Sequence, residues 1–281
     1  MSSTIVVFFA TCFWLGSVMA TPVLNVNSDR AINFKAGKPI TDKELSSGLP
    51  NSNTDSTGEF FPWDKQDPNL LEGDIKPWGE KNVILGSSYR WPKAIIPYVI
   101  SDEYDTDQRQ IIAFAMSTYH NNTCIRFVPR TCETNYIRIY KSGRGCWSYV
   151  GLINQGAQDV GLDDGCIASW APGVVMHEFM HAAGFFHEHS RPDRDTYVSI
   201  NLNNVLEKYR HNFNAYTTSQ VTTLGLSYDY GSVMHYPKGA FAIDNSVDVI
   251  TPLIGTPTIG QRVGFSSLDL QKLNALYCPN P

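Results

Sequence analysis

Three of the seven histidines in this 281-residue chain fall within eleven positions, in a run that also carries a glutamate. His177 and His181 are four residues apart, so on a helix both imidazoles project from one face and can reach the same metal ion. Glu178 then lies beside that ion rather than on it, where its carboxylate can accept a proton from metal-bound water. Gly184 can adopt positive φ and turn the chain, so that His187 arrives from another direction. Three protein ligands with one open position are typical of a catalytic zinc site.

The stretch from His177 to Asp195 resembles the extended zinc signature of the astacin family of metzincin peptidases. It reads HEFMHAAGFFHEHSRPDRD. Glu188 directly follows the third histidine, where other metzincin families place different residues. The similarity extends over about residues 82–278. It implies a secreted zinc-dependent endopeptidase of EC 3.4.24 type, with one Zn²⁺ per chain, that hydrolyses peptide bonds in proteins and peptides.

A second motif, Ser232–Tyr236, is similar to the Met-turn of that family. The resemblance implies that Met234 forms an apolar floor beneath the zinc ligands. It also implies that Tyr236 is an additional zinc ligand, which swings away when substrate binds and then stabilises the oxyanion of the intermediate. In the implied mechanism Glu178 takes the proton of the zinc-activated water and returns a proton to the leaving amine. No covalent acyl-enzyme is needed.

A third motif, Leu71–Asp74, resembles the family's pro-segment motif of an aromatic residue, any residue, Gly and Asp, with Leu in the first position here. The resemblance implies that Asp74 binds zinc in place of water and keeps a zymogen inactive. It places the activation cut between Lys81 and Asn82. The new ammonium group is then expected to be buried and to pair with Glu188.

The segments that would position these residues are predicted from periodicity. We expect a buried strand over 94–100, a helix over 106–119, strands over 125–128, 136–140 and 147–150, a second helix from Pro172 to Gly184 and a final helix over 267–277 capped by Ser267. Turn residues dominate after residue 191, so loops are expected there. The resulting fold class is α+β: an N-terminal subdomain with a twisted mixed sheet and two long helices, followed by a mostly irregular C-terminal subdomain with a final helix.

The chain before residue 82 differs from the rest. Ile5–Val18 is largely apolar and Val18 and Ala20 suit a cleavage site, so we predict a signal peptide over residues 1–20 and an extracellular protein. Residues 21–81 are polar and aperiodic, which on its own fits a linker, a tail or a pro-segment. The resemblance selects a pro-segment, with a catalytic domain over 82–281 (subdomains about 82–184 and 185–281). Asn121 begins the one N-glycosylation sequon.

Six cysteines occur, and Cys12 would leave with the signal peptide. The remaining five are an odd number, which leaves one thiol free or paired with another chain. The resemblance implies two bridges, Cys124–Cys278 and Cys146–Cys166. Cys132 is then either a buried small apolar residue or an intermolecular cysteine.

Other features bear on partners. The net charge of -5 and the lack of a basic run give no nucleic-acid footprint, and no segment after the signal is long and apolar enough for a membrane span. We therefore expect a monomer whose partners are protein or peptide substrates and an activating protease. Residues 147–151 are expected to form the edge strand along which substrate lies antiparallel. Arg262 either lines the pocket after the scissile bond and favours acidic residues, or is a surface residue on a loop.

Two alternatives remain. The first is a catalytically silent, zinc-bearing extracellular binding protein, which predicts a missing base or ligand, whereas Glu178 and all three histidines are present. The second is another metzincin family. A matrix-peptidase type should carry a cysteine in its pro-segment, and residues 21–81 contain none.

Overall fold

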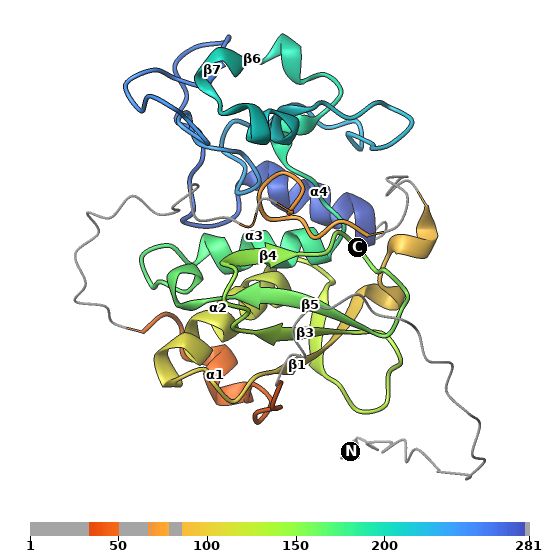
Figure 1. Cartoon of the computed structure of the whole chain (residues 1–281). Helices are drawn as coiled ribbons and strands as arrows, with labels where there is room; N and C mark the ends of the chain where they lie inside the picture. Colours follow the sequence, from red (N-terminus) through yellow and green to blue (C-terminus); the bar gives the residue numbers. More distant parts are fainter. Residues whose placement is uncertain (1–33, 51–66, 68, 79–85, 279–281) are drawn as a thin grey trace, which may run out of the picture. The chain divides into compact units, whose positions relative to one another are not determined.

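The computed structural model describes residues 34–50, 67, 69–78 and 86–278 (Figure 1). Within this part, α1 (Asp42–Ser46), α2 (Thr106–Asn122), α3 (Gly173–Ala182) and α4 (Ser267–Tyr277) are α-helices. A five-stranded sheet contains β1 (Ile95–Ile100), β2 (Arg126–Pro129), β3 (Tyr136–Tyr140), β4 (Cys146–Ser148) and β5 (Ala157–Leu162). The predicted α+β class with a mixed sheet and a final helix is confirmed.

The strand order in the sheet is β2-β1-β3-β5-β4. All neighbours are parallel except β4, which runs antiparallel to β5 and pairs Cys146 with Leu162 and Ser148 with Val160. The segment predicted from residues 147–150 is therefore an edge strand, although it is shorter than predicted. Its side away from β5 pairs with residues 74–76.

Helix α2 is a well-capped amphipathic helix. Asp105 accepts a hydrogen bond from the backbone of Gln108, whose side chain bonds back to Asp105, which forms a capping box. Ile112, Met116 and Tyr119 are fully buried and pack against the sheet and α3. The helix runs three residues beyond the predicted residue 119, through half-buried His120 and exposed Asn121 and Asn122.

Strand β5 was not predicted. Its sequence, AQDVGL, alternates poorly because Gln158 is buried and Gly161 interrupts the run. Gln158 is satisfied locally: its side chain donates to the Gly151 carbonyl and accepts from the Ile153 amide. Gly161 is required because a Cβ there would lie 2.3 Å from the indole nitrogen of Trp147. Contacts distant in sequence, rather than a period-2 pattern, therefore define this strand.

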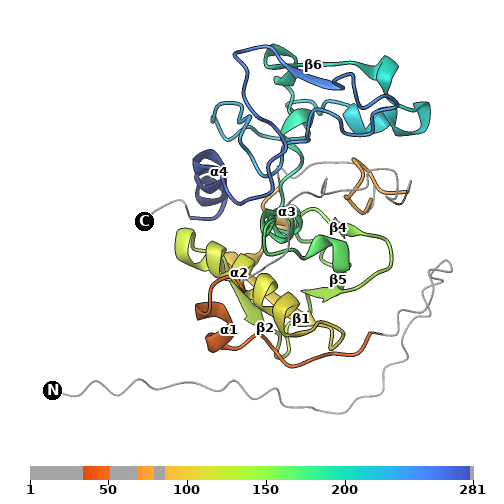
Figure 2. The same ribbon diagram turned by 90° about the vertical axis from the view of Figure 1, so that its left-hand side faces the viewer.

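After Gly184 the chain contains mainly turns and short 3₁₀ segments. Strands β6 (Val198–Ile200) and β7 (Ile250–Pro252) form a small antiparallel pair, and both views show them on the far side of α3 from the five-stranded sheet (Figures 1 and 2). A second apolar cluster, rich in tyrosine and phenylalanine, fills this part. Helix α4 is capped by Ser266 and not by Ser267, because the Ser266 hydroxyl accepts from the Asp269 amide.

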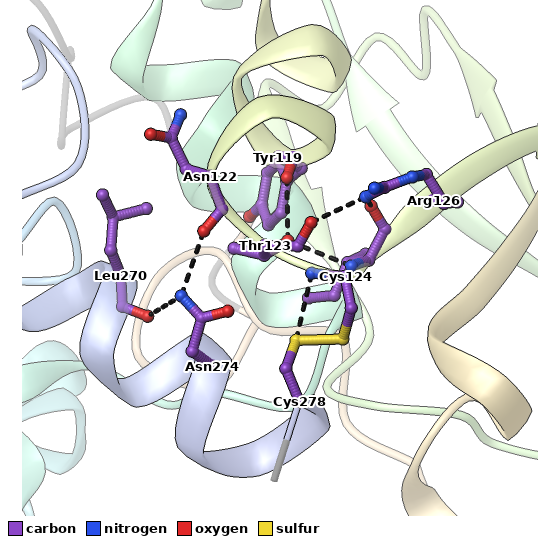
Figure 3. The surroundings of a disulfide bond; sticks show 9 residues. Tyr119, Asn122, Thr123, Cys124, Arg126, Leu270, Asn274 and Cys278 are labelled. Carbon is purple, nitrogen blue, oxygen red and sulfur yellow. Dashed lines mark hydrogen bonds between the residues drawn. A yellow bond between two sulfur atoms is a disulfide. The ribbon is translucent and has the colours of Figure 1, made fainter. Parts of the chain in front are cut away.

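Between cysteines of the described ranges, two disulfides are present, and they are the pairs that the resemblance implies. Cys124 pairs with Cys278 and thereby joins the end of α2 to the end of α4 (Figure 3). Cys146 pairs with Cys166 across 20 residues. Cys132 is exposed, so its prediction as a buried apolar residue is wrong, and the described residues contain no free thiol.

Two groups of predictions lie outside the described residues: the signal peptide at residues 1–20, and the activation cut between Lys81 and Asn82. Asn121, the sequon residue, is exposed in the last turn of α2. Within the described ranges, no helix has both the length and the hydropathy needed to span a membrane.

Candidate metal centre

The three predicted histidine ligands converge. Helix α3 is buried along its whole length and presents His177 and His181 from one face, with their Nε2 atoms 3.1 Å apart. Gly184 follows the helix with a φ of 109°, a conformation that favours glycine. This turn brings the Nε2 atom of His187 to 3.3 Å from that of His177.

A fourth donor comes from the segment before the sheet. We call residues 69–76 the Asp74 loop. The Asp74 carboxylate lies 3.1 Å from His177 Nε2, 3.4 Å from His181 Nε2 and 3.2 Å from His187 Nε2. The loop is closed by backbone hydrogen bonds between Leu71 and Ile75 in both directions, and Gly73 provides positive φ at its tip. All four donors are buried.

The cluster fits a tetrahedral zinc ion. Four ligands at about 2.0–2.1 Å from zinc are about 3.3 Å from one another, close to the separations found here. Each histidine Nδ1 contacts an oxygen: the Val233 carbonyl at 2.8 Å, the Phe185 carbonyl at 2.7 Å and the Glu72 carboxylate at 2.6 Å. These contacts fix the tautomers with the proton on Nδ1, so the three Nε2 lone pairs face one another. Asp74 Oδ1, also buried, has no hydrogen-bond partner. A cation satisfies all four donors.

Glu178 lies next to this cluster, as predicted from its position after the first ligand. It is fully buried, and neither carboxylate oxygen has a hydrogen-bond partner. Burial raises the pKa of Glu178 well above its ordinary value, and the charge of Asp74 raises it further. A buried, unpaired carboxylate of raised pKa is the property expected of a proton acceptor that works near neutral pH.

The turn containing Met234 is bonded to the segment that carries the third histidine. Met234 is buried, and its carbonyl accepts a hydrogen bond from the Glu188 amide directly after the third histidine. Asp269 of α4 fixes the turn, because its carboxylate accepts from the Ser232 hydroxyl at 2.5 Å and from the Val233 amide at 2.8 Å. Asp269 was not predicted, since nothing in its local sequence connects it to residues 232–234.

Tyr236 is buried between His187 and His189, with its ring stacked on the latter at 3.9 Å between centroids. Burial raises its phenol pKa well above the ordinary value, so the hydroxyl is a neutral donor. The hydroxyl donates to the backbone carbonyl of Glu72. In this structure it therefore faces the Asp74 loop.

Glu188 is buried, and among the described residues it contacts Lys272, Arg191 and Asp229. Its carboxylate contacts Lys272 Nζ at 2.6 Å and Arg191 Nη1 at 3.1 Å, and it accepts from the Asp229 amide at 2.8 Å. Because Asn82 lies outside the described residues, its predicted pairing with Glu188 stays a prediction.

Arg262 is buried, so its interpretation as a surface residue is wrong. One guanidinium nitrogen donates to the carbonyls of His235 and Gln261, whereas Nε has no partner. Burial lowers the pKa of Arg262, and the charges of Asp74 and Glu178 act in the opposite direction.

Glu72 is the functional candidate that sequence reasoning missed. It is 2% exposed, and its carboxylate bonds His187 while also accepting from the Ser190 hydroxyl at 3.3 Å. The only available signal was its place beside Asp74, since the motif allows any residue at that position.

Comparisons with known proteins agree with this geometry. The model of the peptidase family described as "Astacin" matches residues 84–278. The chain is 45% identical over 211 residues to meprin A subunit beta of Rattus norvegicus, covering 74% of this chain and 29% of the relative. It is 45% identical over 217 residues to zinc metalloproteinase nas-13 of Caenorhabditis elegans, covering 75% and 47%. The chain thus spans less than half the length of these relatives.

A solved structure is also similar: high choriolytic enzyme 1, a hatching enzyme zinc-protease from the medaka fish Oryzias latipes. The TM-score is 0.61 at 38% identity, covering 73% of this chain and 98% of that chain. The family match covers the three histidines of the metal cluster and Glu178, whereas Asp74 lies before the matched residues. The chain belongs to the astacin family of peptidases.

Proposed function

We propose that this chain is a secreted zinc endopeptidase made as an inactive precursor. The observation that carries the proposal is that the Nε2 atoms of three histidines and the Asp74 carboxylate meet beside Glu178. Neither carboxylate oxygen of Glu178 has a hydrogen-bond partner. That arrangement has a clear chemical use in hydrolysis and none in packing, because an unpaired buried carboxylate destabilises a fold.

The proposed mechanism assigns each residue a task. His177, His181 and His187 would hold Zn²⁺, which supplies a Lewis acid for the attacking water and the scissile carbonyl. Glu178 accepts the water proton and returns it to the leaving amine. Once the Asp74 loop has left, the Tyr236 hydroxyl is freed from the Glu72 carbonyl and donates to the developing oxyanion.

Latency would come from the Asp74 loop. Asp74 occupies the fourth donor position, and Glu72 binds the third histidine from behind. The loop also pairs with the edge strand: Ser148 donates to the Asp74 carbonyl and accepts from the Lys76 amide, and Ile75 bridges Ser148 in parallel. A substrate is predicted to run antiparallel there. The Asp74 loop runs parallel to β4, opposite to the predicted direction of a substrate. It therefore occupies the edge of β4 without placing a peptide bond in the orientation needed for cleavage.

The remaining assignments follow the domain division given above: signal peptide 1–20, pro-segment 21–81 and catalytic domain 82–281. We propose release by a separate protease that cuts between Lys81 and Asn82, glycosylation at Asn121, and protein or peptide substrates for a monomeric enzyme. Arg262, a buried cation near Glu178, would favour acidic side chains after the scissile bond.

The proposal is tested with a peptide library, before and after the chain is cut after Lys81, with and without a zinc chelator. We expect cleavage only in the cut, zinc-loaded protein. Asp74→Ala should weaken the binding of the Asp74 loop to the metal cluster by about 2–5 kcal/mol, so that the uncut chain also cleaves peptides. Asp67→Ala, a carboxylate change outside the cluster, should leave the uncut chain inactive. An inactive cut protein that retains zinc would contradict the proposal.

A further inference from the structure

The described part of the N-terminal segment contacts the rest of the chain at two separate places. One is the Asp74 loop beside β4. The other is residues 35–50, which we call the N-terminal anchor; it contains α1 and lies against α2 and the end of β1 (Figures 1 and 2). The Asp74 loop accounts for occupation of the metal cluster, but the N-terminal anchor contacts no residue of that cluster.

The backbone of the N-terminal anchor extends the end of β1. Ala36 and Ser101 form an antiparallel bridge, with Gly37 donating to the Ile100 carbonyl at 2.8 Å and Asp102 donating to the Lys35 carbonyl at 3.0 Å. Strand addition of this kind holds a peptide through its main chain.

Apolar contacts support the backbone pairing. Ile40 is 6% exposed and belongs to the main core, while Leu45 and Leu49 pack against that core. The Ile40 amide donates to the Tyr98 hydroxyl at 3.0 Å, which satisfies a backbone group that burial would otherwise leave unpaired.

One guanidinium is devoted to this contact. Arg109 of α2 donates from Nε to Glu44 at 2.8 Å, from Nη1 to the Lys38 carbonyl at 3.0 Å and from Nη2 to the Pro39 carbonyl at 3.0 Å. Its side chain is 16% exposed. The neighbouring Gln110 donates to the Gly48 carbonyl at 3.0 Å. We call the surface formed by Tyr98, Arg109 and Gln110 the α2 dock.

We propose that the α2 dock is a binding site for the N-terminal anchor, and that it makes the pro-segment a bivalent inhibitor of the enzyme. The inhibitory role of the anchor rests on the proposed function, whereas its binding to the α2 dock does not. Residues 51–66 connect the two contacts and can reach at most about 60 Å. After a cut at Lys81, this connection keeps the Asp74 loop near the metal cluster at an effective concentration of about millimolar. Rapid activation therefore requires a second cut between the contacts, or loss of the anchor from its dock.

The binding is tested in the chain from Thr21 onward, which lacks the predicted signal peptide and Cys12 and carries Glu178→Ala, so that neither catalysis nor a disulfide to Cys12 is involved. A recognition site for a site-specific protease replaces residues 53–58, the chain is cut there, and the fragments are separated by size exclusion at micromolar concentration. We expect the N-terminal fragment to co-elute with the remainder. Arg109→Ala should release it, whereas Arg210→Ala, which removes an exposed arginine of residues 207–213, should not.

Glu44→Ala provides a second variant, because it alters the anchor and leaves the folded partner unchanged. It should weaken retention as Arg109→Ala does. A freely eluting N-terminal fragment from the parent chain, or full retention in both variants, overturns the proposal. Neither result depends on peptidase activity, so failure of the dock is distinguishable from failure of the proposed function.

The consequence is tested in the active chain by placing the same recognition site before Asn82. After that single cut, the pro-segment should dissociate slowly, and Arg109→Ala should speed the appearance of activity at least about tenfold. Equal rates in the parent and in Arg109→Ala would show that the dock has no part in latency.

Discussion

Two halves of the molecule contribute to one metal cluster by different physical means. The sheet half, residues 86–184, positions His177, Glu178 and His181 on a buried helix that packs against the sheet. The turn half, residues 185–278, positions His187, Met234 and Tyr236 with few regular elements. Repeated backbone ladders hold the first half, whereas individual side-chain hydrogen bonds and ring contacts hold the second.

This difference determines how each half should respond to substitution. In the sheet half many similar contacts stabilise the fold, so losing one of them should have little effect. The largest effects of substitution there should come from residues that take part in catalysis. In the turn half a single buried carboxylate such as Asp269 fixes a whole turn, so a residue far from the chemistry should affect metal binding.

The largest effect is expected from Glu178→Ala in the sheet half. Loss of the proton acceptor should lower kcat/KM of the cut protein by about 10²–10⁴-fold, with zinc content unchanged. The measurement is steady-state kinetics together with metal analysis. Glu207→Ala, an exposed glutamate in the turn half, serves as the control. Loss of zinc along with activity would mean that Glu178 supports the cluster rather than the chemistry.

The second effect concerns the bond between the halves. Cys124 and Cys278 close a loop of 154 residues. Replacing both by serine should lower the free energy of unfolding by about 2–5 kcal/mol, measured in urea. The same change at Cys146 and Cys166, which are 20 residues apart, should cost less in the chain-entropy account. The reverse ranking would show that loop length does not govern the loss.

The two halves also differ in how far they could be predicted. The helix with His177 and His181 follows from spacing, and strands β1 and β3 follow from apolar runs. Strand β5 was missed because Gln158 and Gly161 serve contacts distant in sequence. In the turn half the His187 and Met234 motifs were recognised, but their supports were not. Glu72 and Asp269 act across 115 and 37 residues, and no local pattern reports such pairs.

The third effect tests the turn half directly. Asp269→Ala removes the acceptor of the Ser232 hydroxyl and the Val233 amide. Unfolding free energy should fall by about 2–3 kcal/mol, and zinc affinity should fall because the carbonyl behind His177 moves. Chelator competition and urea unfolding measure the two quantities. Asp107→Ala, an exposed carboxylate in the first turn of α2, should change neither.

The smallest effect is a pH dependence of the binding of the N-terminal anchor, which belongs to neither half of the molecule. Burial raises the pKa of Glu44, but its hydrogen bonds with Arg109 and Thr41 outweigh burial, so the net pKa lies below the ordinary value of 4.5. A lowered folded pKa stabilises the contact above pH 4.5 and loses that stabilisation as pH falls through the lowered value. Retention of the N-terminal fragment should therefore be constant from pH 7 to about 5 and weaken below about 4.5. If retention of the N-terminal fragment already weakened near pH 6, a group other than Glu44 would control the pH dependence.

X-ray absorption at the zinc edge of the full-length chain tests the central claim most directly. The account predicts one zinc per chain with three imidazole rings and one oxygen donor at about 2.0–2.1 Å. Fewer than three imidazoles, or sulfur at about 2.3 Å, would contradict it.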